Sequence, residues 1–255
     1  MQRDFTLSKY TTILTSILSS DYKVIAVLDW IENTCAYEDR TIIIRHDVDR
    51  RPGNALAMAH IESRLGIRST YYFRTVGSAF NEEIISTIAD YGHEIGYHYE
   101  DFFVARYNPE NALNLFRRNL GKLRKLAPIK TIAMHGSPLS RFSNMELWKH
   151  FDFNDFGVSD CILSVDWSQF AFFTDTGRRF DASVTNLRDE IGGQRFEGVR
   201  NSSDLVRFLT ERRPHYAQIS IHPERWNENL FTWSTQWTTD MIANTIKVGL
   251  RTLRS

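Results

Sequence analysis

The sequence predicts an α/β protein, a (β/α) barrel of about six or seven parallel strands, in a single domain over residues 1–255. Short β-branched or aromatic runs alternate with stretches of helical periodicity along most of the chain. A length of 255 residues suits one α/β barrel. Clusters of Asp or His follow several of the predicted strands, and the carboxyl ends of parallel strands meet at one rim of a barrel. These three observations together indicate the fold class.

A leading N-terminal helix is predicted over residues 5–20, where Leu7, Tyr10, Ile13 and Ile17 recur at helical spacing. A short strand at 23–27 and a helical turn at 28–33 follow. β-Branched and aromatic runs then predict strands over residues 41–49, 69–74, 92–101, 131–135, 172–181 (a strand and a turn) and 216–222. Helical spacing predicts helices over residues 52–65, 82–91, 109–126, 144–150, 204–211 and 237–253.

Composition narrows the classes of partner. Acidic and basic residues balance at 31 each, so no bulk charge favours nucleic acid or an anionic membrane, and a small or neutral partner is expected. No window is apolar enough to predict a membrane span, and the first residues lack the pattern of a secretory signal, so we expect a cytoplasmic protein. Cys35 and Cys161 are predicted to be free thiols.

Candidate catalytic and metal-binding residues lie at the ends of two predicted strands. Asp47 and Asp49 close the strand over residues 41–49, and because side chains alternate along a strand they share one face. The next cluster, in residues 92–101, contains His98 and Glu100. A helical crossover between strands makes them parallel neighbours, so both clusters should emerge at the same rim.

These segments resemble the polysaccharide deacetylase family, carbohydrate esterase family four. Its second motif commonly reads Gly-His-Glu-Ile-Gly-Asn-His, and this chain reads Gly92-His-Glu-Ile-Gly-Tyr-His98. Its first motif, Thr-Phe-Asp-Asp-Gly, survives as the spaced pair Asp47 and Asp49. The resemblance covers about residues 41–226. It implies a distorted barrel with fewer than eight strands and a metal-dependent amide hydrolase that acts on N-acylated sugars.

Carried over residue by residue, the resemblance makes Asp47 the catalytic base, Asp49 and His98 ligands of one divalent metal ion, most simply Zn, and His222 the general acid. The family's second metal-binding histidine falls on Phe102.

A third ligand must replace that histidine. Glu100 could reach the ion if the backbone stays extended beyond His98, whereas His135 ends the next strand at the same rim and needs no such condition. We therefore predict His135 as the third ligand.

The remaining motifs match weakly. The family's third motif would fall on residues 135–138, which lack its Arg, and Asp175 and Arg178 are the nearest candidates for the fourth. Together with Trp226, in the loop after the last strand, they are predicted to bind substrate.

Three hypotheses follow from the sequence. The leading one is a metal-dependent deacetylase acting on a sugar or on a cytoplasmic precursor of a surface polysaccharide. The second is hydrolysis of another small amide or imide on the same scaffold. The third is a non-catalytic glycan-binding relative, motivated by Phe102. The oligomeric state is not predicted.

Overall fold

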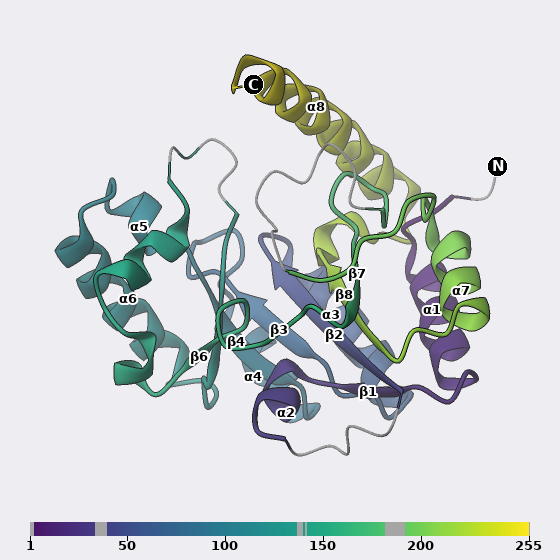
Figure 1. The fold of residues 1–255 in the computed structure, drawn as a ribbon, viewed down its shortest axis with the longest axis horizontal. Helices are drawn as coiled ribbons and strands as arrows, with labels where there is room; N and C mark the ends of the chain where they lie inside the picture. The colour runs from purple at the N-terminus through teal and green to yellow at the C-terminus, as the bar shows by residue number, and fades with distance from the viewer. Residues whose placement is uncertain (1–2, 34–39, 137–139, 141, 182–191, 255) are drawn as a thin grey trace.

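The computed structural model describes residues 3–33, 40–136, 140, 142–181 and 192–254, with side chains as far as residue 245. Within them, a parallel sheet curves into a half-barrel and helices cover its outer side (Figure 1). Seven strands follow the order β6-β5-β4-β3-β2-β8-β7, and β1 pairs with the first half of β2. All these pairings are parallel. The predicted distorted (β/α) barrel of about seven parallel strands is therefore confirmed.

The strands are β1 Lys23–Ile25, β2 Thr41–Val48, β3 Thr70–Phe73, β4 Glu94–Tyr99, β5 Thr131–Met134, β6 Ser159–Asp160, β7 Phe170–Thr174 and β8 Tyr216–Ile221. The α-helices are α1 Leu7–Leu18, α2 Val27–Ile31, α3 Pro52–Arg64, α4 Glu82–Asp90, α5 Asp101–Val104, α6 Pro109–Leu123, α7 Ser202–Glu211 and α8 Leu230–Arg254. In the described ranges the short 3₁₀ helices are η1 Asn144–Lys149, η2 Phe153–Phe156 and η3 Pro223–Arg225.

Several predicted boundaries differ from the observed ones by a few residues, among them the end of β4 and the start of α8. The strand predicted over residues 92–101 ends at Tyr99, because Asp101 begins α5 and its carboxylate accepts hydrogen bonds from Tyr97 Oη at 2.6 Å and Asn119 Nδ2 at 2.8 Å. The last helix begins at Leu230 rather than near residue 237. Its first turn is fastened by the side chain of Asn229, which accepts a hydrogen bond from the backbone N–H of Phe231 at 2.9 Å.

The interior of the half-barrel is filled with side chains. Ile43, Tyr72, Ala133 and Phe172 pack there in one buried cluster. Gly96 faces the Tyr72 ring so closely that an added Cβ would lie 2.3 Å from two ring carbons. The reactive side chains are therefore confined to the rim, where the strands end.

A buried polar cluster around Glu62 joins helices α1 and α3 to the outer face of the sheet. The Glu62 carboxylate, on α3, accepts hydrogen bonds from Tyr10 Oη on α1, from Ser69 Oγ at 2.7 Å and from Tyr71 Oη at 2.6 Å, and pairs with His46 Nε2 at 2.8 Å. Burial opposes the ionised form of Glu62, but His46 outweighs it and lowers the pKa of Glu62 to about 2. Because His46 contacts Glu62 on α3, its side chain points to the outer face of β2, whereas that of the next residue, Asp47, points to the other face.

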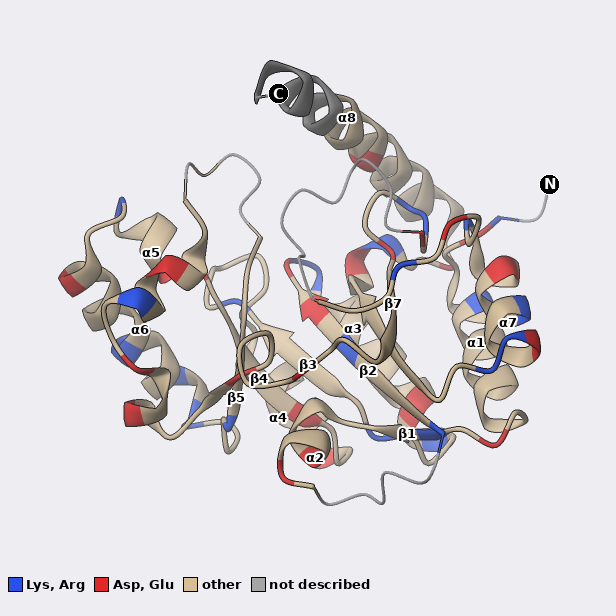
Figure 2. Cartoon of the chain, viewed as in Figure 1, with Lys and Arg blue, Asp and Glu red and all other residues tan. Residues whose placement is uncertain are grey.

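The surface and the cysteines add three facts. Acidic and basic residues alternate on α7, whereas on α6 Glu110 in the first turn is followed by Arg117, Arg118 and Lys122 (Figure 2). None of the helices in the described part of the chain combines the length and the apolar character that a membrane crossing requires. Cys161 is a buried free thiol, whereas Cys35 lies outside the described residues.

Candidate active site

Three strand ends bring Asp49, His98 and His135 together. Asp49 follows β2, His98 lies near the end of β4 and His135 follows β5. His135 Nε2 lies 3.3 Å from Asp49 Oδ1, and His98 Nε2 lies 3.6 Å from the same oxygen. Both contacts are within ion-pair distance, but neither has the geometry of a hydrogen bond, so Oδ1 is left without a hydrogen-bond donor.

His98 is prepared as a neutral ligand. Its Nδ1 lies 3.0 Å from the carbonyl oxygen of Ala133, which can only accept, so Nδ1 carries the proton. Burial lowers the pKa of His98 to about 4, which keeps the ring neutral at pH 7. Nε2 then presents a lone pair to Asp49 Oδ1. Two acceptors face each other across a gap that a cation would bridge.

His135 has a carboxylate at each ring nitrogen. Nδ1 lies 3.2 Å from Glu100 Oε2, and Glu100 is itself held by Arg74, whose Nη2 donates to both carboxylate oxygens at 2.6 and 2.7 Å. Burial opposes protonation of His135, but Asp49 and Glu100 outweigh it and raise its pKa to about 9. Glu100 therefore lies behind His135, in the place where carboxylates commonly orient metal-binding imidazoles.

The three side chains suit a divalent metal ion in kind, and two of their separations are close to those between metal ligands. Two ligands held about 2.1 Å from a tetrahedral ion lie roughly 3.4 Å apart, close to the two separations at Asp49 Oδ1. As the side chains stand, no group of three or more His, Cys, Asp or Glu in the described part of the chain is arranged to hold an ion. Small rotations of the rings and the carboxylate would thus be needed on binding.

Asp47 is held by one oxygen and leaves the other open. Arg45 Nη2 donates to Asp47 Oδ2 at 2.7 Å, and Ser220 Oγ lies 3.4 Å from that oxygen. Oδ1 is buried and has no hydrogen-bond partner. Burial opposes ionisation of Asp47, but Arg45 more than compensates and holds the pKa of Asp47 below its usual value. An ionised carboxylate with a vacant acceptor oxygen can take a proton.

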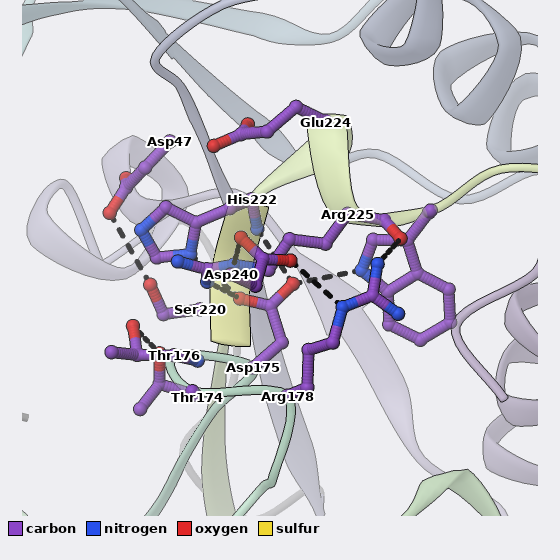
Figure 3. A network of polar contacts seen from close by, with 12 residues as sticks. Asp47, Thr174, Asp175, Thr176, Arg178, Ser220, His222, Glu224, Arg225 and Asp240 are labelled. Carbon is purple, nitrogen blue, oxygen red and sulfur yellow. Dashed lines mark hydrogen bonds and ion pairs between the residues drawn. The ribbon is translucent and has the colours of Figure 1, made fainter. Parts of the chain in front are cut away.

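His222 follows β8 and is oriented by Asp175, which follows β7. His222 Nδ1 lies 2.7 Å from Asp175 Oδ1, and the His222 backbone N–H donates to Oδ2 at 2.9 Å. Figure 3 shows the His222 ring between Asp175 and Asp47. Burial and Arg225 work against protonation, but Asp175 and Asp47 raise the pKa of His222 above its ordinary value. A protonated imidazole at this position can donate to a leaving group.

The residues predicted to bind substrate lie behind this histidine. Trp226 is fully buried and donates from Nε1 to Asp175 Oδ2 at 2.8 Å. Arg178 is buried, pairs with Asp240 of α8 at 2.8 Å, and stacks its guanidinium over Phe5. In this structure Asp175, Arg178 and Trp226 support His222 and present little surface to a ligand.

Sequence reasoning missed several residues that contact the predicted ones, among them Arg74, Ser220 and Arg225, and two further residues at the site itself. Arg45 lies inside the β-branched strand that ends in Asp47, and an Arg in a fully buried strand could have been recognised as needing a carboxylate partner. Glu224 follows His222 by two residues. Its side chain is 2% exposed, its Oε2 has no hydrogen-bond partner, and Figure 3 shows its carboxyl on the Asp47 side of His222. Burial and the charge of Asp49 raise the pKa of Glu224 to about 7.

Comparison with known proteins gives similarities of fold. No family model matches the chain, and no curated protein matches it. A family 4 carbohydrate esterase from Bacillus anthracis has 12% identity and a TM-score of 0.39 over 92% of this chain and 85% of its own. The peptidoglycan deacetylase PdaC of Bacillus subtilis has 13% identity and a TM-score of 0.42 over 73% of this chain and 90% of its own.

PdaA of Bacillus subtilis, a family 4 carbohydrate esterase, has 16% identity and a TM-score of 0.40 over 82% of this chain and 86% of its own. The chain is thus similar to solved structures of carbohydrate esterases and deacetylases.

Proposed function

We propose that this protein is a metal-dependent hydrolase that removes an N-acyl group, acetyl in the simplest case, from a sugar or a polysaccharide precursor. The observation that supports it most is the pair of acceptors His98 Nε2 and Asp49 Oδ1, which face each other at 3.6 Å with His135 beside them. Asp47 on β2 and His222 after the adjacent strand β8 supply a base and an acid. The resemblance of the motifs supports the substrate class.

A divalent ion held by Asp49, His98 and His135 would lower the pKa of water to about 7 and polarise the substrate carbonyl. Two imidazoles and one carboxylate suit Zn. Asp47 Oδ1 takes the proton of the water that attacks the amide carbon. Arg45 and Ser220 meanwhile keep Oδ2 fixed. As the C–N bond breaks, His222 gives its proton to the nitrogen, so the products are a carboxylate and an amine.

A glycan-binding protein without activity is the second candidate, and Phe102 is the observation behind it. Phe102 is buried against the Tyr107 ring, with centroids 5.7 Å apart, so it contributes to the core where the family has a ligand. His135 provides an imidazole at Asp49 in its stead, which favours the hydrolase. Hydrolysis of another small amide remains the alternative within enzymes. The cytoplasmic location also remains a prediction, and with it the choice of a precursor as substrate.

The test combines metal content with acetate release. The protein is supplemented with Zn²⁺, dialysed, and assayed for bound metal and for acetate released from N-acetylglucosamine oligosaccharides. We expect one ion per chain and activity in the wild type, and loss of both in His98→Ala. The matched control is Asp155→Ala, which removes an exposed carboxylate far along the chain from these motifs and should change neither. A wild type that binds no ion after supplementation yet binds the oligosaccharide would contradict the proposal and favour the binding protein.

A further inference from the structure

A chain of charged contacts leads from His222 to α8, outside the residues covered by the motif resemblance. It begins at Asp175, whose two oxygens accept from the backbone and ring of His222, from Arg225 Nη1 at 2.6 Å and from Trp226 Nε1 at 2.8 Å. The carboxylate is completely buried. It has no spare position for water, so its orientation is set by these partners.

Arg225 lies between two carboxylates from different elements. Its Nη1 reaches Asp175, and its Nε lies 4.0 Å from Oδ1 of Asp240 on α8. Nε makes no hydrogen bond, so the second contact is purely electrostatic. Figure 3 shows this arrangement.

Asp240 is fixed in turn. Arg178 Nε donates to its Oδ2 at 2.8 Å, and Gln236 Nε2, one helical turn earlier on α8, donates to its Oδ1 at 2.9 Å. Both donor residues, Arg178 and Gln236, are buried. Charges of opposite sign therefore alternate along the path from Asp175 through Arg225 and Asp240 to Arg178.

We propose that Asp240 is a positioning residue of the active site, which holds Arg225 against Asp175 and so fixes the His222 ring toward Asp47. Helix α8 is then part of the acid half of the site, although it contributes no reacting atom. The inference rests on the proposed function in one respect, that His222 acts as the acid.

The direction of the effect follows from the charges around His222. Asp175 on the β7 side, Asp47 and Asp49 on the β2 side, and Glu224 and Arg225 on η3 are the charged groups that act on it. Arg225 opposes protonation of His222, and Asp240 partly neutralises Arg225. Loss of the Asp240 charge leaves Arg225 to act undiminished, so the pKa of His222 should fall.

The experiment follows the His222 ring by NMR titration in the full chain. In Asp240→Asn we expect the pKa of His222 to fall by about half a unit, a small fraction of what a directly contacting charge does. Asp240→Glu should restore most of it. Thr238→Ala, on the exposed face of the same helix, is the matched control and should leave the titration unchanged. For kinetics, Asp240→Asn should lower kcat about threefold to tenfold and leave KM within twofold.

An unchanged His222 titration in a folded Asp240→Asn protein would overturn the proposal. If Asp240→Asn does not fold, Gln236→Leu decides. It removes the hydrogen bond that holds Asp240 Oδ1 near Arg225 Nε, so Asp240 should neutralise Arg225 less and the pKa of His222 should fall by a smaller amount; no shift there also overturns the proposal. A wild type without deacetylase activity, but with a His222 titration that responds to Asp240, would refute the proposed function and leave the role of Asp240 standing.

Discussion

The two halves of the site differ in how their carboxylates are occupied. In the half formed by β2, β4 and β5, Asp47 and Asp49 each keep an oxygen without a hydrogen bond. In the half formed by β7, β8 and η3, both oxygens of Asp175 are engaged by His222, Arg225 and Trp226, and the vacant oxygen is Oε2 of Glu224, whose carboxyl lies on the Asp47 side of His222. Vacant buried acceptors are costly unless something binds them, whereas a satisfied network makes a rigid support. The first half is built to receive a ligand and the second to hold a histidine still.

His135→Ala should have the largest effect on metal binding and activity, because it removes one of the three proposed metal ligands, which all lie in the first half of the site. We expect the variant to lose its bound metal and its activity while its circular dichroism stays that of the wild type. Metal analysis after dialysis is the measurement. Full retention of metal would show that His135 is not a ligand.

Asp47→Asn should leave the metal in place and lower turnover by about 10²–10⁴, the usual share of general acid–base catalysis. The amide cannot accept the proton of the attacking water. The comparison requires metal content and kcat on the same sample. A fully active Asp47→Asn protein would remove Asp47 from the mechanism, and Glu224 would be the next base to test.

Asp175→Asn tests the second half through stability. Removing one partner from a buried ion pair costs about 3 kcal/mol or more in the free energy of unfolding. Arg225 and His222 hold the pKa of Asp175 well below its usual value against the effect of burial. Its stabilising contribution is therefore complete above the unfolded pKa of about 3.9 and is lost as pH falls below it. Urea unfolding should show the full deficit at pH 7 and a smaller one below about pH 4. An equal deficit at all pH values would mean that the charge of Asp175 is not what stabilises.

His222→Ala should slow amide hydrolysis by about 10²-fold, the lower end of acid catalysis, and slow an activated ester far less, because such a leaving group needs no proton. In the wild type the alkaline limb of kcat/KM should lie above the ordinary pKa of histidine, since the pKa of His222 is raised and the acid is lost only as pH rises through it. Equal losses on amide and ester would instead indicate a role in binding.

The smallest effect is expected for Glu100→Gln, which keeps a hydrogen-bond acceptor behind His135. Metal should remain bound with an affinity reduced about 10–100-fold, as for other groups that orient a metal-binding imidazole. Competition with a chelator measures this. Complete loss of metal would show that Glu100 itself is a ligand.

The sequence predicted the fold well because local patterns determine it. The buried run over residues 41–49 and the periodicity of residues 5–20 each specify one element wherever it packs. The predicted site residues do converge on neighbouring strand ends, which the parallel topology makes almost unavoidable. Contacts between distant segments could not be predicted: nothing local links Asp240 to Arg225, or shows that Trp226 turns inward, since both depend on how α8 and η3 pack.

Gly96 links a packing constraint to a chemical one. A side chain there would collide with Tyr72, and His98 lies two residues further along the same strand. A larger residue would therefore push β4 away from β3 and carry the imidazole with it. A chain with glycine at this position can keep the close packing of β4 against β3, on which the position of the His98 imidazole depends. The glycine can accordingly serve as a marker when looking for divergent chains that retain such a centre, even where the neighbouring Asp pair is spaced differently.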